Sequence, residues 1–247
     1  MKRTSRKPSN LSESLQRHLN SYALAASAAG MGVLALAQPA DGKIIYTPAH
    51  HYVPLNGRLY IDLNHDGRPD FYVRRVSGTA ITTSFFTHLS FTALDAGNAV
   101  RNLDNGMAGY PTYYGGAVFY DLPAGRQIDP SLKFPRKGFM ANRLRNYTTK
   151  GAWHCGGLWN NARSRYLGAR FGIEGKIHYG WVRLNEWCDQ KAPKGDGARA
   201  LLTGYAYETI PNKPIITGKT KGPDVITLAP GSLGALAAGA SRLHSGK

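Results

Sequence analysis

The chain has few acidic residues and few cysteines, and it lacks the short motifs of several common protein classes. Its 247 residues include 31 Lys and Arg, 15 Asp and Glu, and 2 Cys. It contains no Gly-x-Ser-x-Gly elbow, His-Glu-x-x-His helix, Cys-x-x-Cys pair or internal repeat. These absences argue against α/β-hydrolases, zinc proteases and zinc fingers, and we expect a protein that is not an enzyme.

Helix-forming runs are also missing from the part of the chain after residue 42. Long stretches of Ala, Leu, Glu and Lys at helical spacing do not occur there, whereas the chain holds 29 Gly, 14 Pro and 14 Tyr. This composition favours strands and turns, and about 200 residues are enough to bury a core. We therefore expect a mainly β protein, an antiparallel β-sandwich or jelly-roll-like domain with long loops, over residues 43–217.

The first 42 residues resemble a secretory signal peptide. A basic segment precedes 16 uncharged, mostly small and apolar residues, Tyr22 to Ala37, and small residues follow. Cleavage is expected before Lys43, with Ala35-x-Ala37 as a second candidate, and the signal itself is expected to be helical. An uncleaved membrane anchor is the alternative, although 16 residues are fewer than the roughly 20 needed to cross a bilayer. We expect a secreted protein, extracellular or in the cell envelope.

Alternating apolar and polar residues predict several strands. The longest pattern is Ile81–Ala93, interpreted as one half-buried strand, or two joined by a bulge, with Phe91 and Ala93 on the same face as Ile81. Pro48 is expected to end a first strand that begins at Lys43. Gly172–Gly175 has the composition of a hairpin turn. The other expected strands are Leu59–Leu63, Phe71–Val73, Ala117–Tyr120, Arg165–Phe171, Lys176–Leu184 and Leu201–Thr209.

An acidic loop between two of these strands carries the most specific chemical pattern. Counting from Asp62, oxygen-bearing side chains recur at positions 1, 3, 5 and 9, glycine occupies position 6, and a backbone carbonyl falls at position 7. Alternate residues of a curled loop point inward, so this spacing collects the hard oxygen ligands that calcium requires. The expected ligands of a structural Ca²⁺ are Asp62, Asn64, Asp66, the carbonyl of Arg68, and Asp70. A metal-free turn is the alternative.

The segment Leu63–Phe71 resembles the calcium loops of FG-GAP and VCBS-type repeats in exported bacterial proteins. The loop is not an EF-hand, because Val73 stands where the bidentate Glu would be. The chain as a whole resembles a group of exported bacterial proteins that share three further segments, Ile45-Tyr46, Tyr179–Leu184 and Ala206–Thr209. This resemblance implies export and a β fold, and it implies no activity. A propeller is not expected, since only one acidic loop is present.

The two cysteines, Cys155 and Cys188, are expected to form a disulfide in an oxidising compartment. A metal site with His154 is the alternative. The C-terminal residues 218–247 are expected to form a tail. Its Pro, short apolar stretch and basic end resemble a degenerate PEP-CTERM-like sorting signal, although a disordered end is the other interpretation.

Residues 43–247 hold 26 basic and 13 acidic side chains, a formal excess of about +13. Such a surface favours a polysaccharide or another anionic surface polymer as partner, although a solvated basic face that aids solubility is the alternative. Four tryptophans are candidates for a stacking platform or for the core: Trp153, Trp159, Trp181 and Trp187. We expect a carbohydrate- or surface-binding module, with a structural envelope or matrix protein as the alternative. A glycoside hydrolase using Glu208 with Glu174 or Glu186 is a weaker candidate.

Overall fold

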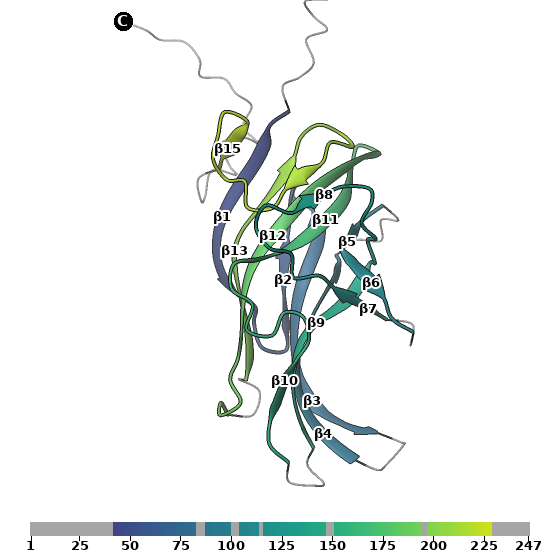
Figure 1. Ribbon diagram of the computed structural model, residues 1–247, viewed down its shortest axis with the longest axis vertical. Coiled ribbons are helices and arrows are strands. Elements are labelled where there is room, and N and C mark those ends of the chain that lie inside the picture. Colours follow the sequence, from purple (N-terminus) through teal and green to yellow (C-terminus); the bar gives the residue numbers. More distant parts are fainter. Residues whose placement is uncertain are drawn as a thin grey trace, which may run out of the picture. The chain divides into compact units, whose positions relative to one another are not determined.

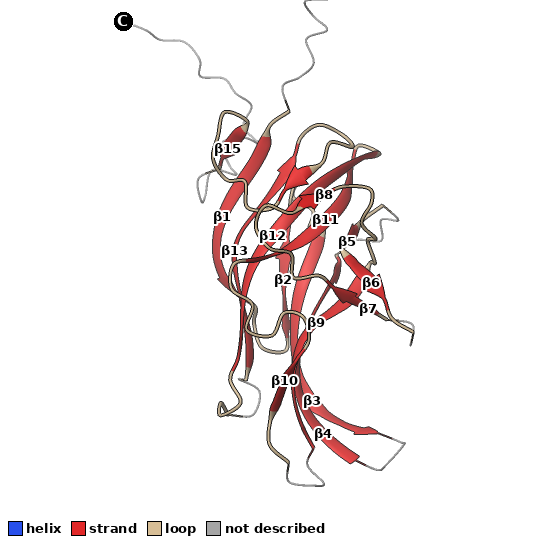
Figure 2. Cartoon of the chain, viewed as in Figure 1, coloured by secondary structure: helices blue, strands red, loops and turns tan. Residues whose placement is uncertain are grey.

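The structure is a computed structural model that describes residues 42–82, 87–99, 104–113, 116–146, 151–193 and 197–228. Contacts divide the chain between Asp41 and Gly42, and the description concerns the second unit, Gly42–Lys247. The predicted signal peptide up to residue 41, and residues 229–247 of the predicted tail, lie outside the described residues. All helix and strand elements in the described ranges are strands, which confirms a mainly β protein (Figure 2). This part of the chain contains no helix suited to spanning a bilayer.

Six strands form the first sheet, called sheet A (Figure 1). Their order is β15-β1-β13-β12-β11-β5, and all neighbours are antiparallel except β1 and β15, which are parallel. The strands are β1 (Ile44–Tyr52), β5 (Gly106–Met107), β11 (Arg165–Ile173), β12 (Lys176–Cys188), β13 (Ala198–Glu208) and β15 (Val225–Thr227).

Seven strands form the second sheet, called sheet B, in the order β2-β3-β4-β9-β7-β6, with β10 paired to β9. They are β2 (Gly57–Ile61), β3 (Phe71–Thr82), β4 (Thr87–Asn98), β6 (Gly109–Pro111), β7 (Ala117–Phe119), β9 (Lys137–Asn146) and β10 (His154–Gly156). The remaining strands, β8 (Gln127–Ile128) and β14 (Ile215–Ile216), pair with each other.

The two large sheets share one hydrophobic core. Phe71, Val73 and Leu94 of sheet B belong to the same buried cluster as Phe171 and Leu184 of sheet A. Every second residue of these strands points into this cluster, as the period-2 geometry of a strand requires. Each sheet therefore has an inner face against the other sheet and an outer face that points away from it.

The outer face of sheet A is covered at one end and open at the other. Trp181 on β12 is fully buried in a second cluster that includes Ile128 of β8 and Ile215 of β14. Trp187 lies on the same face of the same strand, six residues further along, and is only partly buried. At about 3.3 Å per residue this distance is roughly 20 Å, so the covering layer ends before it reaches Trp187.

The prediction of one strand over Ile81–Ala93 is wrong. The segment contains the end of β3 and the start of β4, which pair antiparallel with Thr82 opposite Thr87, so it is a hairpin. The predicted face is also inverted in the described part, because Ser90 and Thr92 are fully buried. Thr92 lies across from Ser77 on β3 and Arg143 on β9, and this polar inner surface compensates for its burial.

Two chain boundaries differ from those expected. β1 does not end at Pro48 but continues to Tyr52 with a register shift after Pro48, where a bulge accommodates the residue that cannot donate a backbone hydrogen bond. Residues 225–227, expected within the tail, form β15 and pair with β1. The hairpin between β11 and β12 is confirmed: Glu174 and Gly175 both have positive φ, as its tight turn requires.

Candidate functional site

The acidic loop Asp62–Asp70 connects β2 to β3 and is closed at its base. The Asp70 backbone N–H donates to the Ile61 carbonyl at 2.9 Å, and the Leu63 N–H donates to the Asp70 carboxylate at 2.8 Å. His65, at the tip, is hydrogen-bonded through Nε2 to Thr47 Oγ1 of β1 at 2.8 Å. The loop of sheet B is therefore fastened to a strand of sheet A.

The carboxylates of the loop accept hydrogen bonds from its own backbone. Asp62 accepts from the N–H groups of Asp66 at 3.3 Å and Gly67 at 2.8 Å, and Asp66 accepts from Arg68 at 2.8 Å. His65 and Gly67 both have positive φ, 61° and 85°, and these two left-handed residues curl the chain around Asp66. The local pattern of Asp, Asn and Gly thus builds a curled acidic loop, as the sequence predicts.

The side chain of Asp70 is only 6% exposed, so its charged form is poorly solvated. The pKa of its carboxyl group is raised to about 7, mainly by burial and also by the nearby Asp62 and Asp66 carboxylates, against the opposing hydrogen bond from Leu63. A cation bound among these carboxylates would favour their ionised forms.

The fit of a calcium ion to this loop is partial. In its favour, Asn64 Oδ1 is buried without a hydrogen-bond partner, and it occupies position 3 of the ligand pattern. Against it, no three His, Cys, Asp or Glu side chains of the described segments form a group that could hold a metal. The oxygen donors that calcium prefers are all in one loop, but the structure does not bring the three carboxylates to one centre.

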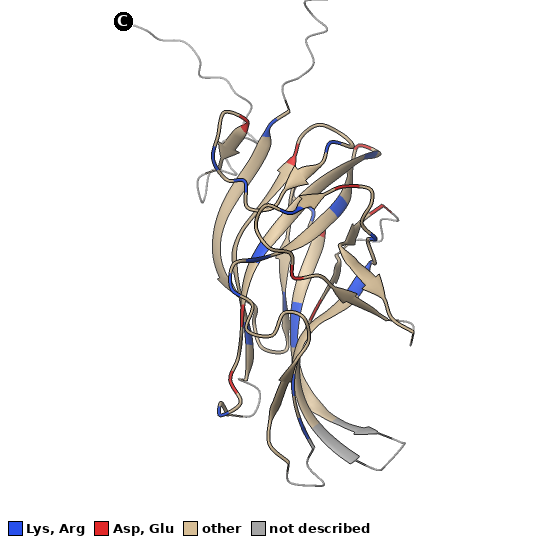
Figure 3. Cartoon of the chain, viewed as in Figure 1, with Lys and Arg blue, Asp and Glu red and all other residues tan. Residues whose placement is uncertain are grey.

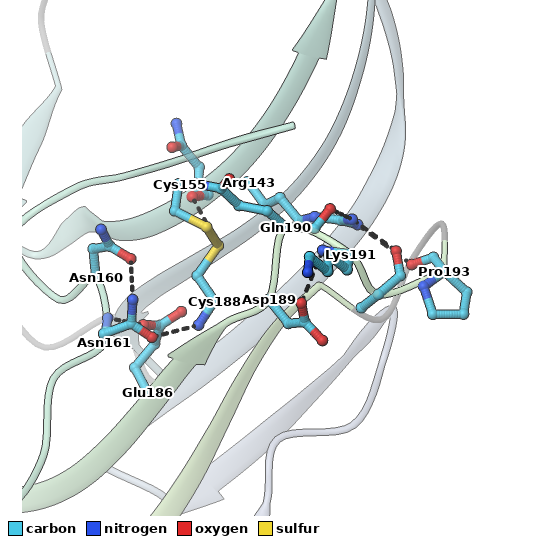
Figure 4. The surroundings of a disulfide bond; sticks show 12 residues. Arg143, Cys155, Asn160, Asn161, Glu186, Cys188, Asp189, Gln190, Lys191 and Pro193 are labelled. Carbon is cyan, nitrogen blue, oxygen red and sulfur yellow. Dashed lines mark hydrogen bonds between the residues drawn. A yellow bond between two sulfur atoms is a disulfide. The ribbon is translucent and has the colours of Figure 1, made fainter. Parts of the chain in front are cut away.

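A disulfide joins the two sheets at a second site (Figure 4). Cys155 on β10 and Cys188 at the end of β12 are bonded, with their Cα atoms 6.0 Å apart, which confirms the predicted pairing. Asn161 Oδ1 accepts the Cys188 N–H at 3.1 Å. The end of β12 is thereby held by both a covalent bond and a hydrogen bond.

A buried carboxyl group, Glu186, lies beside this disulfide. Its Oε2 accepts the Asn161 N–H at 2.6 Å, while its Oε1 is buried with no hydrogen-bond partner. Burial raises the pKa of Glu186 to about 7, and the hydrogen bond from Asn161 and the charge of Arg163 oppose the shift. Glu186 therefore anchors the loop that contains Asn161 at a cost in solvation.

The open end of the outer face of sheet A contains a hollow of about 420 Å³. We call it the Trp187 hollow, and it is lined by Tyr52, Trp187, Asp189, Ala192, Gly197 and Arg199. The Tyr52 side chain is 59% exposed, and its ring centroid lies 6.3 Å from that of Trp187. The Arg163 guanidinium carbon lies 4.5 Å from the Trp187 ring centroid. The hollow therefore combines aromatic rings with both a carboxylate and guanidinium groups.

A buried arginine holds the backbone at one side of this hollow. Arg143 on β9 is fully buried and donates to the carbonyls of Gln190 and Ala192, both at 2.7 Å, and of Pro193 at 3.3 Å. Its guanidinium carbon lies 3.9 Å from the ring centroid of Trp153. The loop after β12 is thus attached to sheet B by Arg143 as well as by the disulfide.

The four tryptophans have different roles. Trp159 and Trp181 are fully buried core residues, Trp153 stacks on Arg143, and Trp187 lines the hollow. Sequence reasoning identified Trp187 as a candidate and considered Asp189 only as an available acid, and it missed Tyr52 and Arg199. The sequence signal for this site was the alternation along β12, which places Trp187 on the outer face. The position of Arg199 opposite Trp187 depends on the pairing of β12 with β13, which is not encoded locally.

Of the two glutamate pairs considered for a glycoside hydrolase, Glu208 with Glu186 is too widely separated to form a catalytic couple. Glu186 points inward, whereas Glu208 lies at the other end of sheet A, beside residue 179 of β12, seven residues away or about 23 Å along the strand. Glu174 is exposed in the β11–β12 turn, and the Glu208 carboxylate pairs with Lys213 at 3.2 Å. Retaining and inverting enzymes need their carboxyl groups within about 10 Å.

Comparisons with other proteins add no homologue to these observations. No protein-family model matches the chain, and neither the curated proteins nor the solved structures contain a match to it.

Proposed function

We propose that this protein is an exported, calcium-stabilised β domain that binds carbohydrate polymers of a surface or matrix through the Trp187 hollow. The observation that carries the proposal is the pair of rings, Tyr52 and Trp187, at the rim of a hollow of about 420 Å³. Its volume is within the range of small-ligand sites, about 300–1,000 Å³. Exposed aromatic rings offer flat apolar contact to the C–H faces of sugars, and Asp189 and Arg199 offer hydrogen-bonding groups for hydroxyls.

Export is supported by the apolar leader and by the disulfide. Cytosolic proteins seldom keep structural disulfides, whereas secreted ones commonly do. Calcium is supported by the oxygen-rich pattern of Asp62–Asp70 and by the unpartnered Asn64 Oδ1. In this proposal the ion is structural, because the loop connects β2 to β3 and contacts β1, away from the residues that line the hollow.

We further propose that the two sheets form an antiparallel β-sandwich. Two sheets share one core, and sequence neighbours pair as meanders, β2-β3-β4 in sheet B and β11-β12-β13 in sheet A. A jelly roll consists of two Greek keys, in which a long connection returns the fourth strand beside the first. The meander order therefore favours the sandwich over the jelly roll.

Binding of the purified protein to an array of neutral and acidic glycans, with calcium present, tests this function. The expected result is binding to at least one polysaccharide that Trp187→Ala or Tyr52→Ala weakens by about tenfold, since removal of an aromatic anchor commonly costs more than 1 kcal/mol. Tyr113→Ala is the matched control, because Tyr113 is 97% exposed and lies outside the hollow. Absence of binding to every glycan would favour the structural envelope or matrix role instead.

A further inference from the structure

A second surface, with one exposed aromatic ring above a buried one and with exposed basic side chains, lies on the outer face of sheet B. The strand register forms two rows across this face: Tyr60, Tyr72, Gly97 and Lys137 in one, and Arg58, Arg74, Asp95 and Phe139 in the other. Their neighbours in sequence, such as Ile61, Phe71, Val73 and Ala96, point into the core. We call this surface the Tyr60 face, defined by Arg58, Tyr60, Tyr72 and Lys137.

The rings of the Tyr60 face are held in place before any ligand binds. A Cβ atom at Gly97 would lie 2.7 Å from Tyr72 Oη, so glycine at this position leaves the space in which the Tyr72 ring lies across the sheet. The Arg58 guanidinium carbon is 4.8 Å from the Tyr72 ring centroid, and the Tyr60 ring meets Tyr72 at 69° with centroids 6.5 Å apart. Tyr60 remains 52% exposed on top of this supported layer.

The charge of the Tyr60 face is positive. Asp95 is the single carboxylate in the two rows, and its oxygens accept hydrogen bonds from Arg74 Nε at 3.0 and 3.2 Å. Within the described part of the sheet, no carboxylate pairs with Arg58 or Lys137, and Figure 3 shows basic residues at positions on both sheets. The face therefore offers two cations without a paired carboxylate, Arg58 beside the exposed Tyr60 ring and Lys137 two strands from Tyr72, and this charge is complementary to an anionic polymer.

The Tyr60 face and the Trp187 hollow point in opposite directions. The inner faces of the two sheets share one core, so their outer faces lie on opposite sides of the unit. The hollow is on the outer face of sheet A, and the Tyr60 face is on the outer face of sheet B. A ligand on one surface leaves the other accessible.

We infer that the Tyr60 face is a second binding surface for acidic polysaccharide, and that one molecule of the protein joins two polymer chains. This inference rests on the proposed function, because the hollow supplies the other attachment. Two sites on opposite sides convert weak contacts into a stable cross-link between neighbouring chains, and binding along a polymer raises the overall avidity.

A bridging assay tests the inference. Hyaluronate is immobilised on beads, the purified protein is added with calcium, and capture of soluble fluorescent hyaluronate is measured beside retention of the protein itself. We expect Tyr60→Ala and Arg58→Glu to lower capture of the soluble chain by about tenfold while the protein stays on the beads through the hollow. Tyr113→Ala, outside both surfaces, should leave both signals unchanged, and thermal melts confirm that each variant is folded.

The outcomes separate the inference from the proposed function. Retention of the wild-type protein without capture of the second chain would overturn bridging and leave the hollow intact. Full capture by Tyr60→Ala would also overturn it and would assign bridging to a dimer. Equal capture of labelled dextran or single-stranded DNA would overturn acidic polysaccharide as the ligand class. Absence of any retention on hyaluronate would overturn the inference, whereas the proposed function would fail only if the glycan array also showed no binding.

Discussion

Asp70 and Glu186 are two buried carboxyl groups whose pKa is raised to about 7 by the same cause, the loss of solvation. Their surroundings are opposite. Asp70 lies near two further carboxylates, which add to the shift, whereas Glu186 lies near Arg163, which reduces it. An added cation would offset the repulsion among carboxylates at the Asp70 site, whereas the Glu186 site already has the charge of Arg163 within the chain.

The two sites also differ in how they are built. All hydrogen-bond partners of the acidic side chains around Asp70 come from the nine-residue loop itself. Glu186 depends on Asn161, 25 residues earlier in the chain, and on a strand end attached by the Cys155–Cys188 disulfide. A similar carboxyl pKa, raised by burial in both cases, is therefore found with hydrogen-bond partners from a local motif and with partners from a distant segment, and perturbation experiments distinguish the two sites.

Removal of the disulfide should produce the largest effect. The Cys155→Ser, Cys188→Ser double variant opens a link between residues 33 apart and should lower the free energy of unfolding by about 4 kcal/mol through the entropy of the unfolded chain. Urea unfolding measures this change. If the two carboxyl sites are independent, the variant still responds to calcium. Loss of the calcium response in a folded variant would show that the sites are coupled.

Glu186→Gln should make stability less dependent on pH. The folded-state pKa of Glu186, about 7, is above its ordinary value of 4.5, so the folded protein binds the proton more tightly than the unfolded chain does. Stability from this group is complete below pH 4.5 and decreases as the pH rises toward 7, by about 3 kcal/mol in total.

Chemical unfolding at pH 5 and pH 8, with calcium in both buffers, measures that dependence. The Gln variant keeps an oxygen for the Asn161 N–H but cannot ionise, so it should gain stability relative to the wild type at pH 8. An identical pH dependence in both proteins would contradict the assignment of the raised pKa to Glu186.

Calcium should have the smallest of the three effects. At about one hundred times its Kd, an ion that binds only the folded state raises the free energy of unfolding by about 2.7 kcal/mol. Thermal melts with calcium and with a chelator measure the shift. Asp66→Asn should abolish the shift, and Glu186→Gln should preserve it. An unchanged midpoint in the wild type would rule out the calcium site.

The parts of the structure that the sequence predicted are those with local causes. The Glu174-Gly175 turn and the acidic loop between two strands depend on residues within a few positions of one another. The disulfide was predicted from a different constraint, since only two cysteines exist. The class of the fold follows from composition and alternation.

The parts that were not predicted depend on contacts between distant strands. Apolar alternation through Ile81–Ala93 cannot reveal that the chain reverses after Thr82, because the reversal is defined by the pairing of β3 with β4, which the alternation of a single segment does not encode. The buried Thr92 donates to Ser77 Oγ at 3.5 Å and lies opposite Arg143, and the proximity of both comes from the register. The Trp187 hollow escaped prediction for the same reason: Tyr52 and Arg199 belong to other strands.

The parallel pairing of β1 with β15 has a mechanical consequence. Ile44, Ile45 and Tyr46 lie beside Val225, Ile226 and Thr227, and both strands run in the same direction. A pull on the two ends of this unit draws β1 from its beginning and β15 from its end, so the strands must slide past each other. Their hydrogen bonds then bear the load together instead of opening one by one, and this edge of sheet A resists tension applied along the chain.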